Sequence, residues 1–415
     1  MHKINDYKVL MIPVENSNVI YVQSFILSGR MNEGIHDSGI SHLLEHVLTE
    51  SWKKCKDDCA KYWGKKGIIT NASTGDTTIN YYVEGLEKNK KELIEYIINI
   101  TTNPQFKKSR IEVEKKAVKE ELTRELNDPG WKIADKIYNI YYNHPGLKNG
   151  NNIPLQIKNL KNLDKTKLIK YCEKIYTPKN ILFIVSGDFN EKSVINLFKQ
   201  TLPIPDFVGI KNIQKNIFKN TKASNHFIKR KGAKIAEIVV SFMANIYPWD
   251  EDVIYFDILV DLLCGGMHSL LMRRLRTELH LIYNIKVFLD SEIIGTLATI
   301  ETTGDQENTK LIIKSIKDVL KDLIKGNWDE EHMTRIKDRF LIKDEKVCKN
   351  NIFFGDYYGS QYLNQLYKEK PKIRTMKQKR QFINKLTKKK LIQTAKKIFK
   401  MEKMVVIYQC QNKQL

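Results

Sequence analysis

Long apolar segments are absent from this chain of 415 residues. No apolar run reaches the roughly 20 residues that a membrane-spanning helix requires. The N-terminal sequence MHKINDYKVLMIPVEN contains neither the apolar core of a signal peptide nor the Arg- and Ser-rich, acid-poor pattern of a transit peptide. We therefore expect a protein without a membrane segment or a cleaved leader.

Cysteine is scarce as well. The 6 cysteines are scattered along the sequence, and the closest pair is Cys55 and Cys59. A lone pair at this spacing, without further partners for a metal, is usually two thiols in a helix. We therefore expect reduced cysteines and a cytoplasmic location.

Acidic residues are outnumbered by basic ones, 48 to 70, which gives a formal net charge of +22 at pH 7. A basic surface can bind nucleic acid, but the lysines are spread along the whole chain and no nucleic-acid-binding module is recognisable. The joint abundance of Ile, Asn and Lys is typical of an AT-rich genome, which we favour as the origin of the charge. Attraction of acidic peptides to a basic chamber is a third interpretation.

The most informative segment is Gly39–Thr49, GISHLLEHVLT. Its apolar residues recur at three- and four-residue intervals, which predicts a helix with one buried stripe. His42, Glu45 and His46 fall on the other side of that helix. Two imidazoles four residues apart can bind one zinc ion, and the carboxylate between them can accept a proton from water at the metal. This order of residues is the inverted form of a zinc-peptidase motif.

A second segment, Glu112–Leu126, has the composition of a long charged helix. Glu114 and Glu121 are seven residues apart, so they share one face of that helix. Seventy-four residues separate His46 from Glu121. Because a hydrolytic zinc site usually takes three protein ligands, this helix holds the candidates for the third.

With this motif and this spacing, the chain resembles the pitrilysin/insulinase family of zinc metallopeptidases. The resemblance implies that His42, His46 and Glu121 hold one zinc ion per chain. It further implies that Glu45 is the general base and that Glu114 is a second catalytic glutamate, close to the metal.

Other segments carry the same resemblance. SFILSGRMNEGIHDSGISHLLEH resembles the strand, glycine turn and entry to the metal helix of the family, and His144-Pro145 and Tyr176–Phe189 match two further landmarks. NASTGDTTINYYVEGL, residues 71–86, resembles the edge strand that pairs with an extended substrate. The resemblance implies that Asn71 and Ala72 bind the substrate, with affinity from backbone hydrogen bonds.

An internal duplication predicts the domain organisation. The sequence that starts at Leu163 aligns without a gap with the one that starts at Leu386, and each copy reads as an amphipathic helix followed by an apolar strand. We predict two homologous domains, 1–203 and 226–415, joined by a linker at 204–225. The second copy lacks the histidine pair, so the first alone is expected to hold metal. The expected fold class is α+β, with a mostly antiparallel sheet packed with helices in each domain.

The second domain contributes a different candidate, RTELHLIY. In the family that the chain resembles, an arginine and a tyrosine at this spacing contact the substrate beside the scissile bond, which implies this role for Arg276 and Tyr283. The family usually has Gly-Leu-Ala where this chain has His280, Leu281 and Ile282, so the turn geometry stays open. Family members of this size form half of a clamshell, which implies a homodimer, or a complex with a hetero-partner, around a closed chamber.

Together these features predict a zinc-dependent endopeptidase that hydrolyses peptides or unfolded polypeptide segments. Two alternatives stay open. One is a catalytically silent partner or scaffold subunit of the same family, although such a subunit has no need to keep Glu45. The other is a basic nucleic-acid-binding protein with a vestigial metal site.

Overall fold

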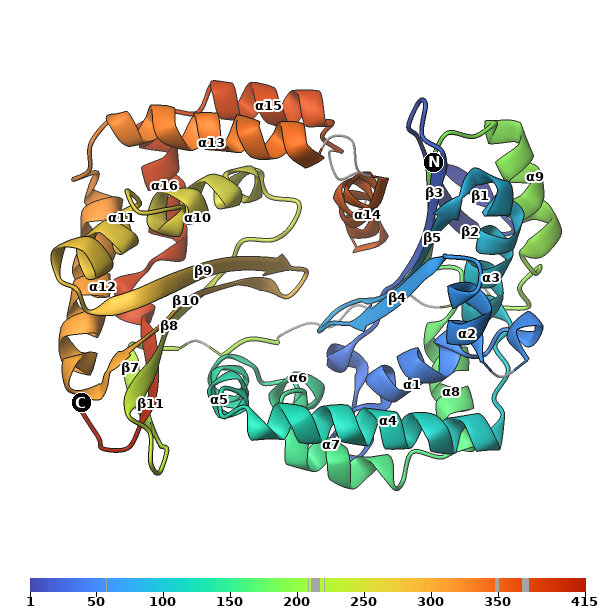
Figure 1. Ribbon diagram of the computed structural model, residues 1–415, viewed down its shortest axis with the longest axis horizontal. Helices are drawn as coiled ribbons and strands as arrows, with labels where there is room; N and C mark the ends of the chain where they lie inside the picture. The colour runs from blue at the N-terminus through green and yellow to red at the C-terminus, as the bar shows by residue number, and fades with distance from the viewer. Residues whose placement is uncertain (57, 208, 210–216, 220, 348–350, 368–372) are drawn as a thin grey trace. The chain divides into compact units, whose positions relative to one another are not determined.

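The computed structural model describes residues 1–415 except 57, 208, 210–216, 220, 348–350 and 368–372. Helices pack with two separate sheets, one of six strands and one of five (Figure 1). Each sheet contains one parallel strand pair, and its other pairs are antiparallel. The predicted α+β class with mostly antiparallel sheets is confirmed. None of the described helices combines the length and the apolar character of a membrane span.

The chain forms two compact units, each made of three segments. Unit 1 comprises Met1–Asn127, His144–Asn216 and Cys348–Ile373, and unit 2 comprises Asp128–Asn143, Ile217–Val347 and Arg374–Leu415. The units differ from the predicted contiguous domains because residues 128–143 lie with unit 2 and residues 348–373 with unit 1. Of the predicted linker, 208, 210–216 and 220 lie outside the described residues, and Ser224 and Asn225 already belong to a strand.

In unit 1 the strands lie in the order β1-β2-β6-β3-β5-β4, so β4 is an edge strand. The strands are β1 (His2–Ile4), β2 (Tyr7–Pro13), β3 (Val19–Ile26), β4 (Ile69–Thr74), β5 (Ile79–Leu86) and β6 (Ile181–Gly187). The helices are α1 (Ile40–Thr49), α2 (Cys59–Gly64), α3 (Lys90–Thr102), α4 (Lys108–Asn127), α6 (Pro145–Asn149), α7 (Ile153–Leu160), α8 (Lys165–Ile175), α9 (Glu191–Thr201) and α14 (Asn351–Tyr367).

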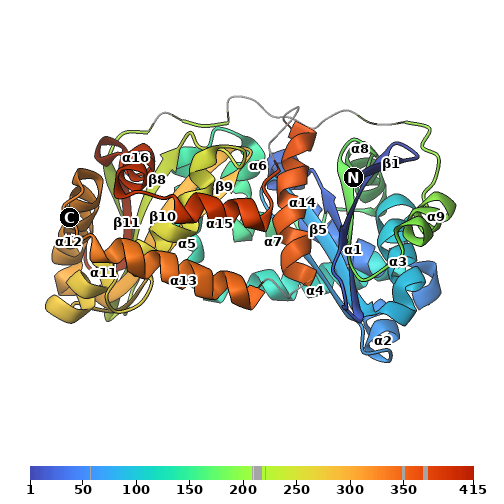
Figure 2. The same ribbon diagram turned by 90° about the horizontal axis from the view of Figure 1, so that it is seen from above.

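Helix α14 belongs to unit 1 because it covers one face of this sheet (Figure 2). Apolar side chains of the helix pack with buried residues of β2, β3 and β6. Gly355 and Gly359 let the helix approach closely: a Cβ at Gly359 would lie 2.3 Å from Cδ1 of Ile184, and one at Gly355 would lie 2.5 Å from Cε1 of Tyr21. Burial of this apolar sheet face explains why the helix lies with unit 1 and not with its neighbours in sequence.

Unit 2 repeats the topology of unit 1. Its sheet has the order β7-β11-β8-β10-β9, which matches β2-β6-β3-β5-β4 strand by strand. The predicted duplication, with its offset of 223 residues, is visible in the elements. Helix α8 shifted by 223 residues has the bounds of α16, and β6 shifted in the same way has the bounds of β11 to within one residue. The strands are β7 (Ser224–Lys229), β8 (Ile235–Ala244), β9 (Ile282–Glu292), β10 (Gly295–Asp305) and β11 (Val405–Cys410). The helices are α5 (Trp131–Tyr141), α10 (Phe256–Cys264), α11 (Leu270–Met272), α12 (Thr309–Lys325), α13 (Glu331–Val347), α15 (Met376–Asn384) and α16 (Lys388–Ile398).

Cys55 and Cys59 form a disulfide, so the expectation of two thiols in a helix is wrong. The two residues do not share a helix. Cys55 ends the 3-10 helix η3 (Lys53–Cys55), Lys56 adopts a left-handed conformation with φ 53°, and Cys59 begins α2. This turn brings the two Cα atoms to 4.7 Å, within the range that a disulfide spans. Of the described cysteines, Cys172, Cys264 and Cys410 are free.

Candidate metal centre

Helix α1 forms as the periodicity predicts, and buried contacts fix its first turn. Gly39 precedes the helix with φ 93°, a conformation that favours glycine. The carboxylate of Glu33, which is buried, accepts hydrogen bonds from the backbone N–H groups of Gly39 and Ser41 at 2.9 and 3.0 Å. It thereby satisfies N–H groups that lack partners within the helix. The apolar stripe of the helix is buried: Ile40, Leu43, Leu44, Val47 and Leu48.

The structure brings the three predicted ligands together. Nε2 of His42 lies 3.6 Å and Nε2 of His46 lies 3.5 Å from the same oxygen, Oε2 of Glu121 on α4. One ligand atom from each residue falls within 4.8 Å of the other two. Zinc–ligand bonds of about 2.0–2.2 Å in a tetrahedron place neighbouring ligand atoms about 3.4 Å apart. Two imidazole nitrogens and one carboxylate oxygen at these separations fit a zinc ion with one position left open.

Glu45 lies on α1 between the two histidines and is 8% exposed. Burial raises the pKa of this carboxyl, while a hydrogen bond from Thr74 and the two neighbouring imidazoles act in the opposite direction. Oγ1 of Thr74 donates that hydrogen bond to Oε2 of Glu45 at 2.8 Å. Thr74 ends β4, and sequence reasoning missed it, although it stands two residues after the substrate-binding candidate Ala72.

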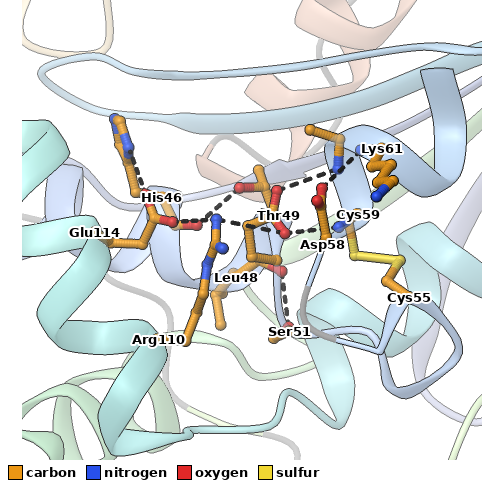
Figure 3. A network of polar contacts seen from close by, with 12 residues as sticks. His46, Leu48, Thr49, Ser51, Cys55, Asp58, Cys59, Lys61, Arg110 and Glu114 are labelled. Atoms are coloured by element: carbon orange, nitrogen blue, oxygen red, sulfur yellow. Dashed lines mark hydrogen bonds and ion pairs between the residues drawn. A yellow bond between two sulfur atoms is a disulfide. The ribbon is translucent and has the colours of Figure 1, made fainter.

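Glu114, expected to be a second catalytic glutamate close to the metal, contacts the ligand candidate His46 (Figure 3). Its Oε2 lies 3.2 Å from Nδ1 of His46, while the other ring nitrogen faces Glu121. A carboxylate behind a metal-binding imidazole fixes the orientation and tautomer of the ring. The second oxygen of Glu114 pairs with Arg110, one turn earlier on α4. Glu114 therefore does not occupy the position of a ligand; it holds His46.

Charges at the centre shift the pKa values of two ligands. Burial alone would lower the pKa of His46, but the hydrogen bond with Glu114 and the nearby carboxylates raise it above its ordinary value. The hydrogen bond with His42 lowers the pKa of Glu121 against the effect of burial. Both shifts reflect the pairing of two imidazoles with a cluster of carboxylates, the charge pattern that also attracts a divalent cation.

A cavity of about 710 Å³ opens beside the ligands. Its lining contains two of the predicted ligands and three basic side chains: His46, Lys116, Ala117, Lys119, Glu120, Glu121, Thr123 and Arg124. All but His46 come from α4, so the cationic side chains stand on the same helix as the third ligand.

The substrate-binding candidates of the first unit lie on the sheet edge. Residues 71–86 form a hairpin of β4 and β5 rather than one strand, and β4 pairs with β5 alone in the described part of the sheet. Asn71 is exposed, and its Oδ1 accepts a hydrogen bond from N–H of Ala72 at 2.9 Å. Both residues thus stand on a strand that has one free edge.

Arg276 and Tyr283 lie in unit 2 and contact each other. The Arg276 guanidinium lies 4.5 Å from the centre of the Tyr283 ring, and its Nη1 donates to the Tyr283 carbonyl at 2.8 Å. Tyr283 is 78% exposed, so its hydroxyl is free to meet a ligand. His280 adopts φ 52° in the turn between them. This left-handed conformation explains a preference for glycine there, and histidine is among the residues that tolerate it.

Two family models match the chain. The insulinase model of peptidase family M16 matches residues 8–150, which include all the predicted metal ligands, and the peptidase M16 inactive domain matches residues 162–340. The zinc protease PqqE of Helicobacter pylori is 24% identical over 352 residues, which cover 80% of this chain and 76% of that protein. The mitochondrial-processing peptidase subunit beta of Neurospora crassa is 21% identical over 209 residues, 45% of this chain and 43% of that one.

Solved structures share the fold. The crystal structure of a protease from Helicobacter pylori superposes with a TM-score of 0.86 at 21% identity, over 98% of this chain and 97% of that one. A peptidase M16 inactive domain from Pseudomonas fluorescens gives a TM-score of 0.85 at 14% identity, over 99% and 97%. Since the two M16 models together match most of the chain and both units adopt this fold, the chain belongs to the pitrilysin/insulinase (M16) family of peptidases.

Proposed function

We propose that this protein is a zinc-dependent endopeptidase. The observation that carries the proposal is the convergence of His42, His46 and Glu121 at separations suited to tetrahedral zinc, with the buried Glu45 beside them. Relatives named as zinc proteases support the same activity. A zinc ion in this centre would act as a Lewis acid on the scissile carbonyl and lower the pKa of water.

Three residues beside the predicted ligands have separate roles in hydrolysis. Glu45 accepts the proton of the attacking water and delivers it to the leaving amine, a role favoured by a pKa above the ordinary carboxyl value. Thr74 orients the Glu45 carboxylate through its hydrogen bond. Glu114 holds His46 so that Nε2 stays directed at the metal.

The substrate adds to the free edge of β4 as an extended strand. In the free protein the side chain of Asn71 accepts the N–H of Ala72, so this side chain must turn away before that donor can bind substrate. Backbone pairing of this kind gives affinity with little dependence on sequence. The cavity beside the ligands carries Lys116, Lys119 and Arg124, which supports a preference for acidic side chains near the cut.

Arg276 and Tyr283 complete the site. We infer a homodimer in which the pair of one protomer serves the zinc centre of the other, with Arg276 on a peptide carbonyl and Tyr283 donating to the developing oxyanion. A hetero-partner is the alternative assembly, as the subunit name of the mitochondrial-processing peptidase relative suggests for that protein. The chamber limits substrates to peptides and unfolded segments.

Two rival functions make different predictions. A silent partner subunit would bind zinc without turnover, and a nucleic-acid-binding protein would show strongly salt-dependent retention on DNA without a need for metal. The complete set of Glu45 and three ligand residues in one centre favours the enzyme over both. The cytoplasmic location stays a prediction. The Cys55–Cys59 disulfide argues against it, because disulfides persist mainly in oxidising compartments.

The deciding experiment compares the wild type with Glu45→Gln on a mixed peptide library, with cut sites read by mass spectrometry and bound zinc measured in both proteins. We expect cleavage by the wild type alone and about one zinc ion in each. Zinc without cleavage in the wild type would favour the silent subunit. A wild type that binds no zinc would refute the metal centre.

A further inference from the structure

A line of polar contacts leads from the metal centre to the disulfide (Figure 3). It begins with His46 and Glu114 and continues with Arg110, whose Nη2 contacts Oε1 of Glu114 and lies 3.5 Å from Oε2 of Glu50. Glu50 follows the last residue of α1 and accepts the backbone N–H of Cys59 at 2.7 Å. The line therefore ends on the first residue of α2, which is also half of the disulfide.

The electrostatics of this line make each member depend on the next. The side chains of Glu114 and Glu50 are only 7% and 11% exposed, so each carboxylate needs a partner. A single guanidinium nitrogen of Arg110 serves both. Without Arg110, two poorly solvated carboxylates would face each other and Glu114 would lose the contact that holds it against His46.

The far end of the line is fixed by covalent geometry. Glu50 accepts hydrogen bonds from Cys59 and, at 3.3 Å, from Ala60, both at the start of α2. The disulfide ties this start to Cys55, four residues earlier. The position of these N–H groups, and hence of Glu50, therefore depends on the closed turn.

We propose that Arg110 and Glu50 are positioning residues of the metal centre and that the turn closed by Cys55–Cys59 anchors them. The inference rests on the proposed zinc site. Reduction by a dithiol breaks the sulfur–sulfur bond, yields two thiols and converts the dithiol into a disulfide. The freed turn no longer holds Glu50 in place, Arg110 and Glu114 lose their fixed geometry, and His46 binds zinc more weakly.

The test measures the zinc affinity of purified full-length protein by competition with a chromophoric chelator. Arg110→Met should weaken zinc binding about 10-fold, the lower end of the effect of losing a support behind a metal ligand. Arg110→Lys keeps a cation that can serve both carboxylates and should recover most of the affinity. Lys115→Met is the matched control. Lys115 pairs with Glu112 on the same helix, and its replacement removes one positive charge, as Arg110→Met does. The Lys115→Met protein should bind zinc as the wild type does.

The disulfide is tested by its dependence on Arg110. Cys55→Ser/Cys59→Ser, or reduction of the wild type by a phosphine that is oxidised to its oxide, should lower zinc affinity in the wild-type background. In the Arg110→Met background the same change should have little further effect, since the line is already broken. The visible spectrum of the cobalt-substituted protein should change both in Arg110→Met and in Cys55→Ser/Cys59→Ser. A general loss of stability would not change this spectrum.

The outcomes separate this inference from the proposed function. A wild type that binds no zinc refutes the function. A wild type that binds zinc and cleaves peptides, with equal zinc affinity in Arg110→Met and in Lys115→Met, overturns the inference alone. Additive effects of Arg110→Met and disulfide loss would overturn the link to the turn. If Arg110→Met does not fold, Glu50→Gln, which keeps the shape and removes the charge, tests the same line and should lower zinc affinity in the same direction.

Discussion

Replacement of Thr74 by valine tests how the general base is tuned. The valine keeps the shape of the side chain and removes the hydroxyl that donates to Glu45 at 2.8 Å. A hydrogen bond to a charged group contributes about 1.5–3 kcal/mol, and one pKa unit corresponds to about 1.4 kcal/mol. Because Glu45 is only 8% exposed, water replaces the lost donor poorly. The pKa of Glu45 should therefore rise by about 1–2 units.

The assay is the pH dependence of kcat/KM with an internally quenched fluorescent peptide. The hydrogen bond stabilises the ionised base, so its loss should move the acidic limb of the profile to higher pH by the same amount. Thr74→Ser keeps the hydroxyl and is the matched control, with a profile close to the wild type. An acidic limb that stays in place in Thr74→Val, or moves equally in Thr74→Ser, would refute the role assigned to this contact.

Three further predictions concern metal, assembly and stability. The pKa of His46 is raised, and zinc binds the neutral ring. Zinc affinity should therefore fall as the pH drops through that pKa, by about tenfold per pH unit for one proton. Equal affinities at both ends of a calorimetric pH series would contradict this. Mixing Glu45→Gln protein with Arg276→Ala/Tyr283→Phe protein after subunit exchange should restore about a quarter of wild-type activity if sites are shared in a dimer, and none if they are not. Trp63→Ala should lower the free energy of unfolding by about 3–5 kcal/mol, since Trp63 is 1% exposed; a chemical denaturation midpoint that does not move would contradict its place in the core.

The sequence alone determined what depends on local periodicity. An α-helix returns to the same face after three or four residues, so the spacing of His42 and His46 within the pattern of buried leucines was enough to predict both the helix and its metal-facing side. The same argument placed Glu114 and Glu121 on one face of α4. The duplication was also readable, because each copy keeps its helix and strand in register with the other.

Tertiary structure decided the contacts between segments far apart in the chain. Thr74 reaches Glu45 because β4 lies beside α1. Helix α14 lies with unit 1 because it buries an apolar face of that sheet. The disulfide escaped prediction because Lys56 interrupts the helix that the four-residue spacing suggested. Periodicity assigns a side chain to a face, but the partner on that face depends on how the elements pack, and packing is set by the burial of the whole apolar surface.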